Sequence, residues 1–502
     1  MTKLLPLLVA VMLWPQAPFR SFVERASGAF ACQGPPAAAQ APAAQARGLE
    51  GVWQGTIEAG GAKLRMVVTV AKRPDGTYTA TLDSPDQGVT GIPVDSVTLG
   101  GAAVRFELKS AGGVYEGTLN EEGTAVTGQW KQGPATLPLT LNRVDKAPPA
   151  PARPQEPQRP YPYDEAEVSY ENAKAGVRLA GTLTLPRSKG PHPAALLISG
   201  SGQQDRDETI LGHKPFLVLA DYLTRRGVAV LRVDDRGVGG SAAGPNLAKA
   251  TSEDFAGDVL SGIEFLKGRK DIDPKRIGLI GHSEGGMIAP MVASRSADVA
   301  YIVLLAGPGL RAEEGFAAQL SAIAKAGGSG DETIAWNQKL LKQIFSVMRE
   351  EKDDAVAGRK VREIRAKMVG ELSEAERKRL GLADDALEGV IQVMLTPWFR
   401  FFTAYDPRAT LLKVSVPVLA VNGGLDLQVV PATRHLAAIE EALKAGKNKD
   451  YEVRELPKLN HLFQTTETGS PAEYGRLEET FSPAALKVIG DWVVRHTAPQ
   501  SN

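Results

Sequence analysis

The chain has 502 residues, which is enough for two or three domains. Its 58 basic and 58 acidic residues give a formal net charge of +0, which excludes a strong electrostatic attraction to nucleic acid or to an anionic membrane. The single cysteine, Cys32, excludes an internal disulfide and a multi-thiolate metal site.

The N-terminal segment is typical of an export leader. A lysine precedes the apolar run Leu4–Trp14, which is short for a membrane-spanning helix. Ala29–Ala31 and Ala44–Ala46 both have the small-x-small form of a cleavage site, and an uncleaved leader is the alternative. Cys32 is a candidate lipid-attachment site, although the large aliphatic residue that such sites usually carry three positions earlier is missing. We therefore expect residues 1–47 to be an export leader followed by a disordered Ala/Pro/Gln-rich tether.

This leader predicts a location outside the cytoplasm. We expect a periplasmic or secreted protein, either free or held by its leader or a lipid, with no integral membrane domain in the mature chain. No nucleic-acid partner is expected, because the balanced charge offers no basic surface.

Residues 48–144 predict a small all-β domain. Short segments alternate apolar and polar residues, and turn sequences such as Pro74–Gly76 and Glu121–Gly123 separate them. The predicted strands are Val52–Ile57, Lys63–Val70, Thr77–Leu82, Ala103–Leu108, Val114–Leu119, Ala125–Trp130 and Ala135–Leu141. This pattern is typical of an antiparallel β-barrel or sandwich. Its first strand resembles the Gly-x-Trp start of lipocalin-like barrels, in which Trp53 would fill the core.

Residues 145–163 contain seven prolines and predict a semi-rigid, extended linker between two independently folding units.

Residues 164–498 alternate strands and helices. The predicted strands are Glu167–Glu171, Val177–Leu185, Ala194–Ser199, Val228–Asp234, Arg276–Gly281, Val299–Ala306, Pro417–Asn422 and Tyr451–Leu456. The predicted helices are Pro215–Arg226, Ser252–Lys267, Gly285–Ser296, Ala432–Lys444 and Pro483–Thr497. Short apolar strands between helices indicate a buried, mostly parallel sheet, so we expect an α/β fold.

One stretch breaks this alternation. Residues 311–402 are charged, helical in pattern and without strands, which predicts an inserted helical cap. Within it, the apolar residues Leu380, Ala383, Leu387, Ile391 and Met394 recur at helical spacing. Such caps shape a pocket and exclude water from it.

The most informative motif is Gly281-His282-Ser283-Glu284-Gly285, between an apolar strand and a helix of small residues. In this context a G-x-S-x-G sequence indicates a sharp strand-to-helix turn that carries a nucleophilic serine. The glycines are needed because a Cβ would clash where strand and helix meet. The alternative is a tight turn in a nucleotide-binding fold.

A nucleophilic serine needs a base, and the base needs an acid that orients it. On such a sheet the acid and then the histidine follow the serine in chain order. Asp426 lies in a glycine turn after the strand ending at Asn422, and His461 follows the last strand, so these two are our candidates. A turn-capping aspartate and a structural histidine are the alternatives.

The other five histidines fit the role of base less well. His192 and His213 lie in loops, His282 cannot turn back to its neighbouring serine, His435 has ordinary surface spacing in a helix, and His496 ends the last helix.

Two backbone N–H groups would bind an oxyanion. We expect one from Glu284 at the start of the helix, and one from the glycine-rich loop after the strand Ala194–Ser199. In that loop Ser201 is favoured, with Gly202 and Gln203 as alternatives. The loop Asp234–Ser241 is interpreted as a scaffold at the rim of the site.

At this point a resemblance becomes specific. The region from Tyr163 to Thr497 resembles the α/β-hydrolase superfamily, and within it the bacterial serine carboxylesterases that carry a GSG-x-x-DRD loop. The matching motifs are GSGQQDRD at Gly200–Asp207, GHSEGG at Gly281–Gly286 and LNHLFQ at Leu459–Gln464. The resemblance implies the triad Ser283, Asp426 and His461 and the hydrolysis of short-chain acyl esters. The chain lacks the HGGPG loop of proline iminopeptidases and the propeller of prolyl-oligopeptidase relatives.

We therefore expect a serine carboxylesterase that acts on a small-molecule ester through an acyl-enzyme, with no metal and no organic cofactor. One alternative is a serine peptidase or thioesterase of the same superfamily. The other is a surface binding protein with a vestigial hydrolase domain, in which the β-domain does the work.

Overall fold

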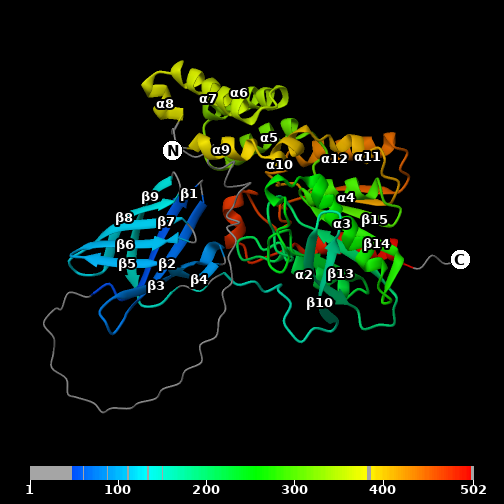
Figure 1. Ribbon diagram of the computed structural model, residues 1–502, viewed down its shortest axis with the longest axis horizontal. Helices are drawn as coiled ribbons and strands as arrows, with labels where there is room; N and C mark the ends of the chain where they lie inside the picture. The colour runs from blue at the N-terminus through cyan, green and yellow to red at the C-terminus, as the bar shows by residue number, and fades with distance from the viewer. Residues whose placement is uncertain are drawn as a thin grey trace, which may run out of the picture.

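The computed structural model describes residues 48–498, apart from residues 60–61, 88, 110–111, 133–134, 148, 150 and 381–385. The expected leader and tether, including Cys32, lie outside the described residues. Figure 1 shows three parts: a β-domain in blue and cyan, an α/β unit, and a helical cap in yellow above them. In the part of the chain that the structure describes, no helix is long and apolar enough to cross a membrane.

The β-domain is a nearly closed, barrel-like antiparallel sheet, as expected. Its nine strands run in the order β4-β3-β2-β1-β9-β8-β7-β6-β5. The strands are β1 (Gly51–Ala59), β2 (Ala62–Lys72), β3 (Tyr78–Ser84), β4 (Val89–Val94), β5 (Ser96–Gly100), β6 (Ala103–Leu108), β7 (Gly113–Leu119), β8 (Ala125–Gln132) and β9 (Ala135–Val144). The outermost strands, β4 and β5, are joined by a single residue, Asp95, so the chain itself brings the two edges together.

Successive residues of each strand face opposite sides of this sheet, and the large apolar side chains face its interior. Trp53 is fully buried and donates its indole N–H to the carbonyl oxygen of Leu49 at 2.8 Å. Phe106 and Tyr115 stack with ring centroids 5.7 Å apart, and the Tyr115 hydroxyl donates to the carbonyl of Val126 at 2.8 Å. Trp53 is therefore a core residue with its one polar atom satisfied.

The sequence did not predict β4 and β5. Gly91 and Pro93 interrupt β4, and both residues disfavour strands in general. Pro93 is tolerated because β4 is the terminal strand of the sheet order, where one side of the strand needs no backbone donor.

The α/β unit is built on eight strands in the order β10-β11-β13-β12-β14-β15-β16-β17. They are β10 (Asp164–Asn172), β11 (Val177–Leu185), β12 (His192–Ile198), β13 (Ala229–Val233), β14 (Ile272–His282), β15 (Tyr301–Leu305), β16 (Val418–Gly423) and β17 (Tyr451–Leu456). β10, β11 and β13 pair antiparallel, and the pairs from β13 through β17 are parallel. The predicted mostly parallel sheet is confirmed, because all eight predicted strands occur in it.

Helices cover both faces of this sheet. α2 (Pro215–Thr224) and α13 (Pro483–Thr497) pack on one face, and α3 (Ser252–Lys267), α4 (Gly285–Ala293) and α12 (Ala432–Ala445) pack on the other. Every residue of α4 is buried, which explains its lack of charged side chains. The carboxyl ends of the parallel strands, where such folds place their sites, therefore lie between these layers and the cap.

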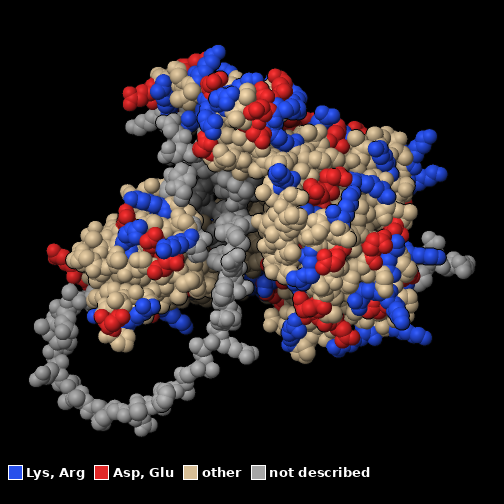
Figure 2. All heavy atoms as spheres, viewed as in Figure 1, with Lys and Arg blue, Asp and Glu red and all other residues tan. Residues whose placement is uncertain are grey.

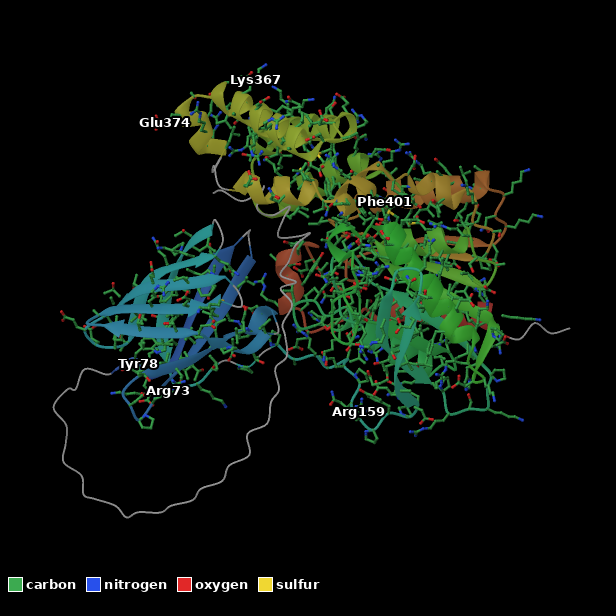
Figure 3. The ribbon with its side chains drawn as sticks, in the orientation of Figure 1. Arg73, Tyr78, Arg159, Lys367, Glu374 and Phe401 are labelled. Carbon is green, nitrogen blue, oxygen red and sulfur yellow. The ribbon has the colours of Figure 1, made fainter. Side chains whose placement is uncertain are left out.

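The predicted cap consists of helices α5 (Ala312–Ala326), α6 (Asp331–Glu350), α7 (Asp354–Gly370), α8 (Glu374–Leu380), α9 (Ala386–Met394) and α10 (Pro397–Ala404), followed by α11 (Pro407–Leu411). Of the apolar residues expected at helical spacing, Leu380 lies on α8, Leu387, Ile391 and Met394 lie on α9, and Ala383 lies outside the described residues. In Figure 3 the labelled Phe401 of α10 lies where the cap meets the α/β unit, and Lys367 and Glu374 lie at its far end.

The cap has its own apolar core around Phe345, Phe399 and Ile391. Beside this core, a shallow apolar groove lies between α5, α6 and α9, lined by residues such as Leu320, Leu341 and Met394. None of the predicted site residues lines this groove.

The described residues of the linker form turns and irregular backbone that are fastened to the α/β unit. The Arg153 guanidinium donates to the carbonyl oxygens of Leu211 and Gly212 and to those of Gly475 and Leu477, at 2.8 to 3.2 Å. The Gln155 side chain accepts from the Thr480 and Phe481 N–H groups and donates to the Phe481 carbonyl.

The β-domain contacts the α/β unit at one short helix. η4 (Pro471–Arg476), the orange-red helix between the two parts in Figure 1, packs against η1 (Pro85–Gln87) and β2. The approach is close: a Cβ on Gly475 would lie 2.0 Å from the carbonyl oxygen of Asp86. The Asp86 carboxylate is itself held by Arg65, with an N–O distance of 2.7 Å.

Candidate functional site

Ser283 occupies a strained turn between β14 and α4. Its φ of 53° lies in the left-handed region, which residues with a Cβ rarely adopt. The two glycines beside it have no space for a side chain. A Cβ on Gly281 would lie 2.0 Å from the carbonyl oxygen of Gly285, and a Cβ on Gly285 would lie 2.2 Å from the carbonyl oxygen of Ile198. These contacts force the serine to the tip of the turn, as the sequence motif predicts.

Asp426 and His461 meet beside this turn. Oδ2 of Asp426 accepts a hydrogen bond from Nδ1 of His461 at 2.8 Å. Oδ1 accepts from the N–H groups of Gln428 and Val429, which fixes the carboxylate. Burial alone would raise the pKa of Asp426, but the charge and hydrogen bond of His461 lower it below its ordinary value. The second ring nitrogen of His461 is therefore the one left to serve as a base.

The predicted oxyanion loop passes directly over Ser283. A Cβ on Gly200 would lie 3.3 Å from the Cβ of Ser283. Both ends of the loop are tied down: the Gly200 N–H donates to Glu208 at 2.7 Å and the Gln204 N–H donates to Asp235 at 2.9 Å. This leaves the three N–H groups between them, those of Ser201, Gly202 and Gln203, as candidates, the same set that the sequence predicts.

Glu284, the residue after Ser283, carries a buried carboxyl group. Its Oε1 accepts from the Ser252 hydroxyl at 2.6 Å and from the indole N–H of Trp398 at 2.9 Å. Burial raises the pKa of this carboxyl, and hydrogen bonds from Ser252, Trp398 and the Ser201 side chain oppose the rise. Glu284 thus joins the turn of Ser283 to the loop after β12 and to helix α10 of the cap.

The loop Asp234–Ser241 has the scaffold contacts that the sequence suggests. Asp234 pairs with Arg206 at 2.7 Å and accepts from the Gly240 N–H at 2.9 Å. Asp235 accepts from the Ser199 hydroxyl and the Gln204 N–H, and burial raises its pKa well above the ordinary value.

His435 differs from its sequence-based interpretation, and His282 agrees with its own. His435 does not lie on the surface: it is 3% exposed, and its Nδ1 accepts from the Gly309 N–H at 3.2 Å. The surface interpretation was wrong because helix α12 packs against the loop after β15, a contact that spacing along one helix does not reveal. His282 does not face its neighbour Ser283 but bonds to Glu208 and to the backbone of His461.

Sequence reasoning missed Glu208, and it placed Asp235 only within the scaffold loop Asp234–Ser241 and Trp398 only among the apolar residues of the expected cap. Glu208 and Asp235 follow directly after recognisable motif residues, so an acidic residue beside a glycine-rich loop was the available signal. Trp398 carries no local signal for its contact with Glu284, which is 114 residues away along the chain.

The chain is similar to known hydrolases. The family described as "Alpha/beta hydrolase family" matches residues 195–474, which is more than half of the chain. Esterase EstD of Thermotoga maritima is 26% identical over 321 residues, covering 63% of this chain and 66% of that protein. Uncharacterized protein Rv2307c of Mycobacterium tuberculosis is 30% identical over 128 residues, covering 26% of this chain and 41% of that protein. The matches thus span less than two thirds of these relatives' lengths.

Solved structures include an esterase of Pyrococcus furiosus, Pf2001, which covers 67% of this chain and 92% of its own, with 15% identity and a TM-score of 0.40. The α/β hydrolase GrgF of Penicillium covers 67% of this chain and all of its own, with 17% identity and a TM-score of 0.41. Together, the family match and the sheet with its strand-to-helix serine turn establish that the chain belongs to the alpha/beta hydrolase family.

Proposed function

We propose that this protein is a serine carboxylesterase that hydrolyses short-chain acyl esters. One observation carries the proposal: Ser283 stands in a left-handed strand-to-helix turn, beside a buried histidine that is hydrogen-bonded to a buried aspartate. The similarity to Esterase EstD supports the ester as substrate.

The chemistry follows from the roles of these groups. His461 removes the proton from the Ser283 hydroxyl as the serine attacks the ester carbonyl carbon, and Asp426 holds the imidazole in the orientation that this transfer needs. The carbonyl oxygen becomes an oxyanion, which the backbone N–H groups of Glu284 and Ser201 bind. His461 then protonates the leaving alkoxide. Water, deprotonated by His461, releases the acid from Ser283.

The experiment is to label the protein with a fluorophosphonate and to measure ester hydrolysis. Ser283→Ala should lose labelling and about 10³-fold or more in kcat on p-nitrophenyl acetate, as removal of a triad member does. Ser261→Ala is the matched control, because the Ser261 hydroxyl donates to the helical carbonyl of Gly257 and should leave labelling intact. Labelling that persists in Ser283→Ala contradicts the assignment.

The same assay separates the alternative activities. Faster turnover of an aminoacyl amide than of p-nitrophenyl acetate would indicate a peptidase, and a preference for a thioester would indicate a thioesterase. A folded protein that turns over none of the three would favour the binding-protein alternative.

We also propose that the protein acts outside the cytoplasm, because its first residues have the pattern of an export leader. Fractionation of the native host should find ester hydrolysis in the periplasm or the medium, and activity confined to the cytoplasm would contradict this.

A further inference from the structure

A buried acid–base pair lies directly beneath Ser283, outside the candidate triad. Oε1 of Glu208 is 2.9 Å from Nδ1 of His282, and the two residues are 1% and 5% exposed. Glu208 has a φ of 51°, so its backbone adopts a rare conformation that places its side chain here.

Each member of the pair also contacts a loop of the candidate site. The same oxygen of Glu208 accepts from the Gly200 N–H at 2.7 Å, at the start of the oxyanion loop. Nε2 of His282 lies 3.0 Å from the carbonyl oxygen of His461. A continuous chain of three hydrogen bonds therefore runs from the oxyanion loop, under the nucleophile, to the backbone of the base.

The partners of His282 fix its protonation. Its Nε2 faces a carbonyl oxygen, which only accepts hydrogen bonds, so this nitrogen donates. Its Nδ1 faces the Glu208 oxygen that accepts from the Gly200 N–H, and it donates to this oxygen when Glu208 is a carboxylate. Donation from both nitrogens requires an imidazolium ring, because neutral imidazole has a single N–H. Burial opposes this charge, but the charge and hydrogen bond of Glu208 outweigh it and raise the pKa of His282.

The neighbouring charges favour the same state. The groups that face His282 are Glu208, Asp426 and His461, whose ring centroid is 4.8 Å from that of His282. Asp235 interacts electrostatically with both Glu208 and Glu284 behind the oxyanion loop. Attraction to these acidic groups stabilises a positively charged His282 ring relative to a neutral one, and it acts more strongly in a buried site than in water.

We propose that Glu208 and His282 form a carboxylate–imidazolium pair that positions the oxyanion loop and the His461 backbone relative to Ser283. The proposal rests on ester hydrolysis through Ser283. Glu208 and His282 touch no reacting atom in it: they are positioning residues. Their effect on the reaction comes from alignment, since a displacement of about 1 Å in an active site costs on the order of 10²-fold in rate.

The test compares Glu208→Gln, His282→Gln and the double variant in the full-length protein. The amide oxygen of Glu208→Gln still accepts from Gly200 but no longer holds a cation, so His282 becomes neutral and loses one of its two bonds. Each single variant should lower kcat by about 10- to 100-fold with KM changed less than about threefold, because alignment affects the transition state more than substrate binding. The double variant should lose no more than the larger single loss, because the two residues act as one unit.

A second readout counts the protons on His282 directly. With [¹⁵N]histidine labelling, the wild type should show two N–H groups on one ring throughout about pH 6 to 8, where an isolated histidine loses its charge. This signal should be absent from His282→Gln, which assigns it, and Glu208→Gln should show a single N–H on that ring.

Asn448→Ala is the matched control for loss of a buried hydrogen-bonded side chain. Asn448 donates to the carbonyls of Val414 and Val416 at 2.9 Å each, away from the site. This variant should lower the melting temperature and leave kcat unchanged.

Three results would overturn the proposal: a single N–H on His282 in the wild type, folded single variants with wild-type kcat, or a double variant that loses the product of both single losses. If Ser283 is not labelled and no ester is hydrolysed, the proposed function fails by itself, and the proton count on His282 still decides whether the pair exists.

Discussion

Three acidic side chains are buried around Ser283, namely Glu208, Glu284 and Asp426, and a fourth, Asp235, is partly buried beside them. Each is held by backbone or side-chain donors, which is the condition under which a protein tolerates a buried carboxyl group. The four acids follow β12, β13, β14 and β16, and their hydrogen bonds to Gln204, Ser252 and His282 join segments that are distant in sequence.

The sequence offered the candidate triad but not the residues that hold it in place. Ser283, Asp426 and His461 follow strands in an order that chain connectivity makes recognisable. Glu208 reaches His282 across 74 residues from a left-handed backbone position, and neither property has a local sequence pattern.

Asp426→Asn tests the orientation of His461. The amide can retain the bonds that Oδ1 accepts from Gln428 and Val429, but its NH₂ group would face Nδ1 of His461. The imidazole would then favour the wrong tautomer, and we expect kcat to fall by on the order of 10⁴-fold while the melting temperature changes little. Near-wild-type turnover of p-nitrophenyl acetate would mean that the orienting acid is another residue.

The buried His435 should make the free energy of unfolding decrease at acid pH. Burial lowers its pKa from 6.5 to about 4, so the folded protein favours the neutral ring. The resulting stabilisation is complete above the unfolded pKa near 6.5, decreases as the pH falls toward 4, and amounts to about 3 kcal/mol.

The measurement is the free energy of unfolding between pH 7 and pH 4. His435→Gln should flatten its decline, because glutamine does not titrate. Burial also lowers the pKa of His213 to about 4, so part of the decline should persist in this variant. An unchanged decline in His435→Gln would show that His435 does not contribute.

At the scale of elements, the strands were predictable and the contacts between elements were not. The eight strands of the α/β unit are short apolar runs, which burial on both faces of the sheet requires. In the β-domain, β4 was not predicted because it contains Gly91 and Pro93, which disfavour strands. It forms as the terminal strand of the sheet, where these residues are tolerated. The contact between α10 and the nucleophile turn depends on the packing of the whole cap.

Trp398→Phe tests whether α10 shapes the acyl pocket. The Trp398 ring stacks on Phe402 with centroids 5.5 Å apart, and its N–H donates to Glu284. Phenylalanine keeps the apolar packing and removes the donor, so α10 loses its bond to the nucleophile turn. We expect kcat/KM for esters of long acyl chains to change about 10-fold, and that for acetate to change less than about threefold, since one hydrogen bond to a charged group contributes about 1.5 to 3 kcal/mol.

Trp336→Phe is the control, because Trp336 packs against the same cap core from α6. It should lower the melting temperature without altering acyl preference. A uniform loss across all acyl lengths in Trp398→Phe would indicate a purely structural role.

At the scale of the whole molecule, the surface shown in Figure 2 intersperses basic and acidic side chains over all three parts, in keeping with the zero net charge. The parts are connected through the loop that follows His461. The η4 helix contacts the β-domain, its Tyr474 carbonyl lies 2.8 Å from Nε2 of His213, and Gln428, next to the Asp426 turn, donates to the Tyr474 hydroxyl at 3.3 Å.

Two truncated chains separate the contribution of the β-domain from that of the linker. A chain beginning at residue 151 keeps Arg153 and Gln155, and one beginning at residue 163 loses both. Without Arg153, the carbonyls of Gly475 and Leu477 lose their donor beside η4. An unsatisfied buried acceptor costs about 1 to 3 kcal/mol, so the shorter chain should melt at a lower temperature. It should also have a lower kcat on p-nitrophenyl acetate, because η4 supports the loops of His461 and Asp426. The chain beginning at residue 151 should remain within several-fold of the full protein in kcat/KM, since the β-domain supplies none of the candidate catalytic residues.

If both truncated chains fold and both are inactive, the contact of η1 with η4 is itself needed for activity, and the β-domain is part of the catalytic unit.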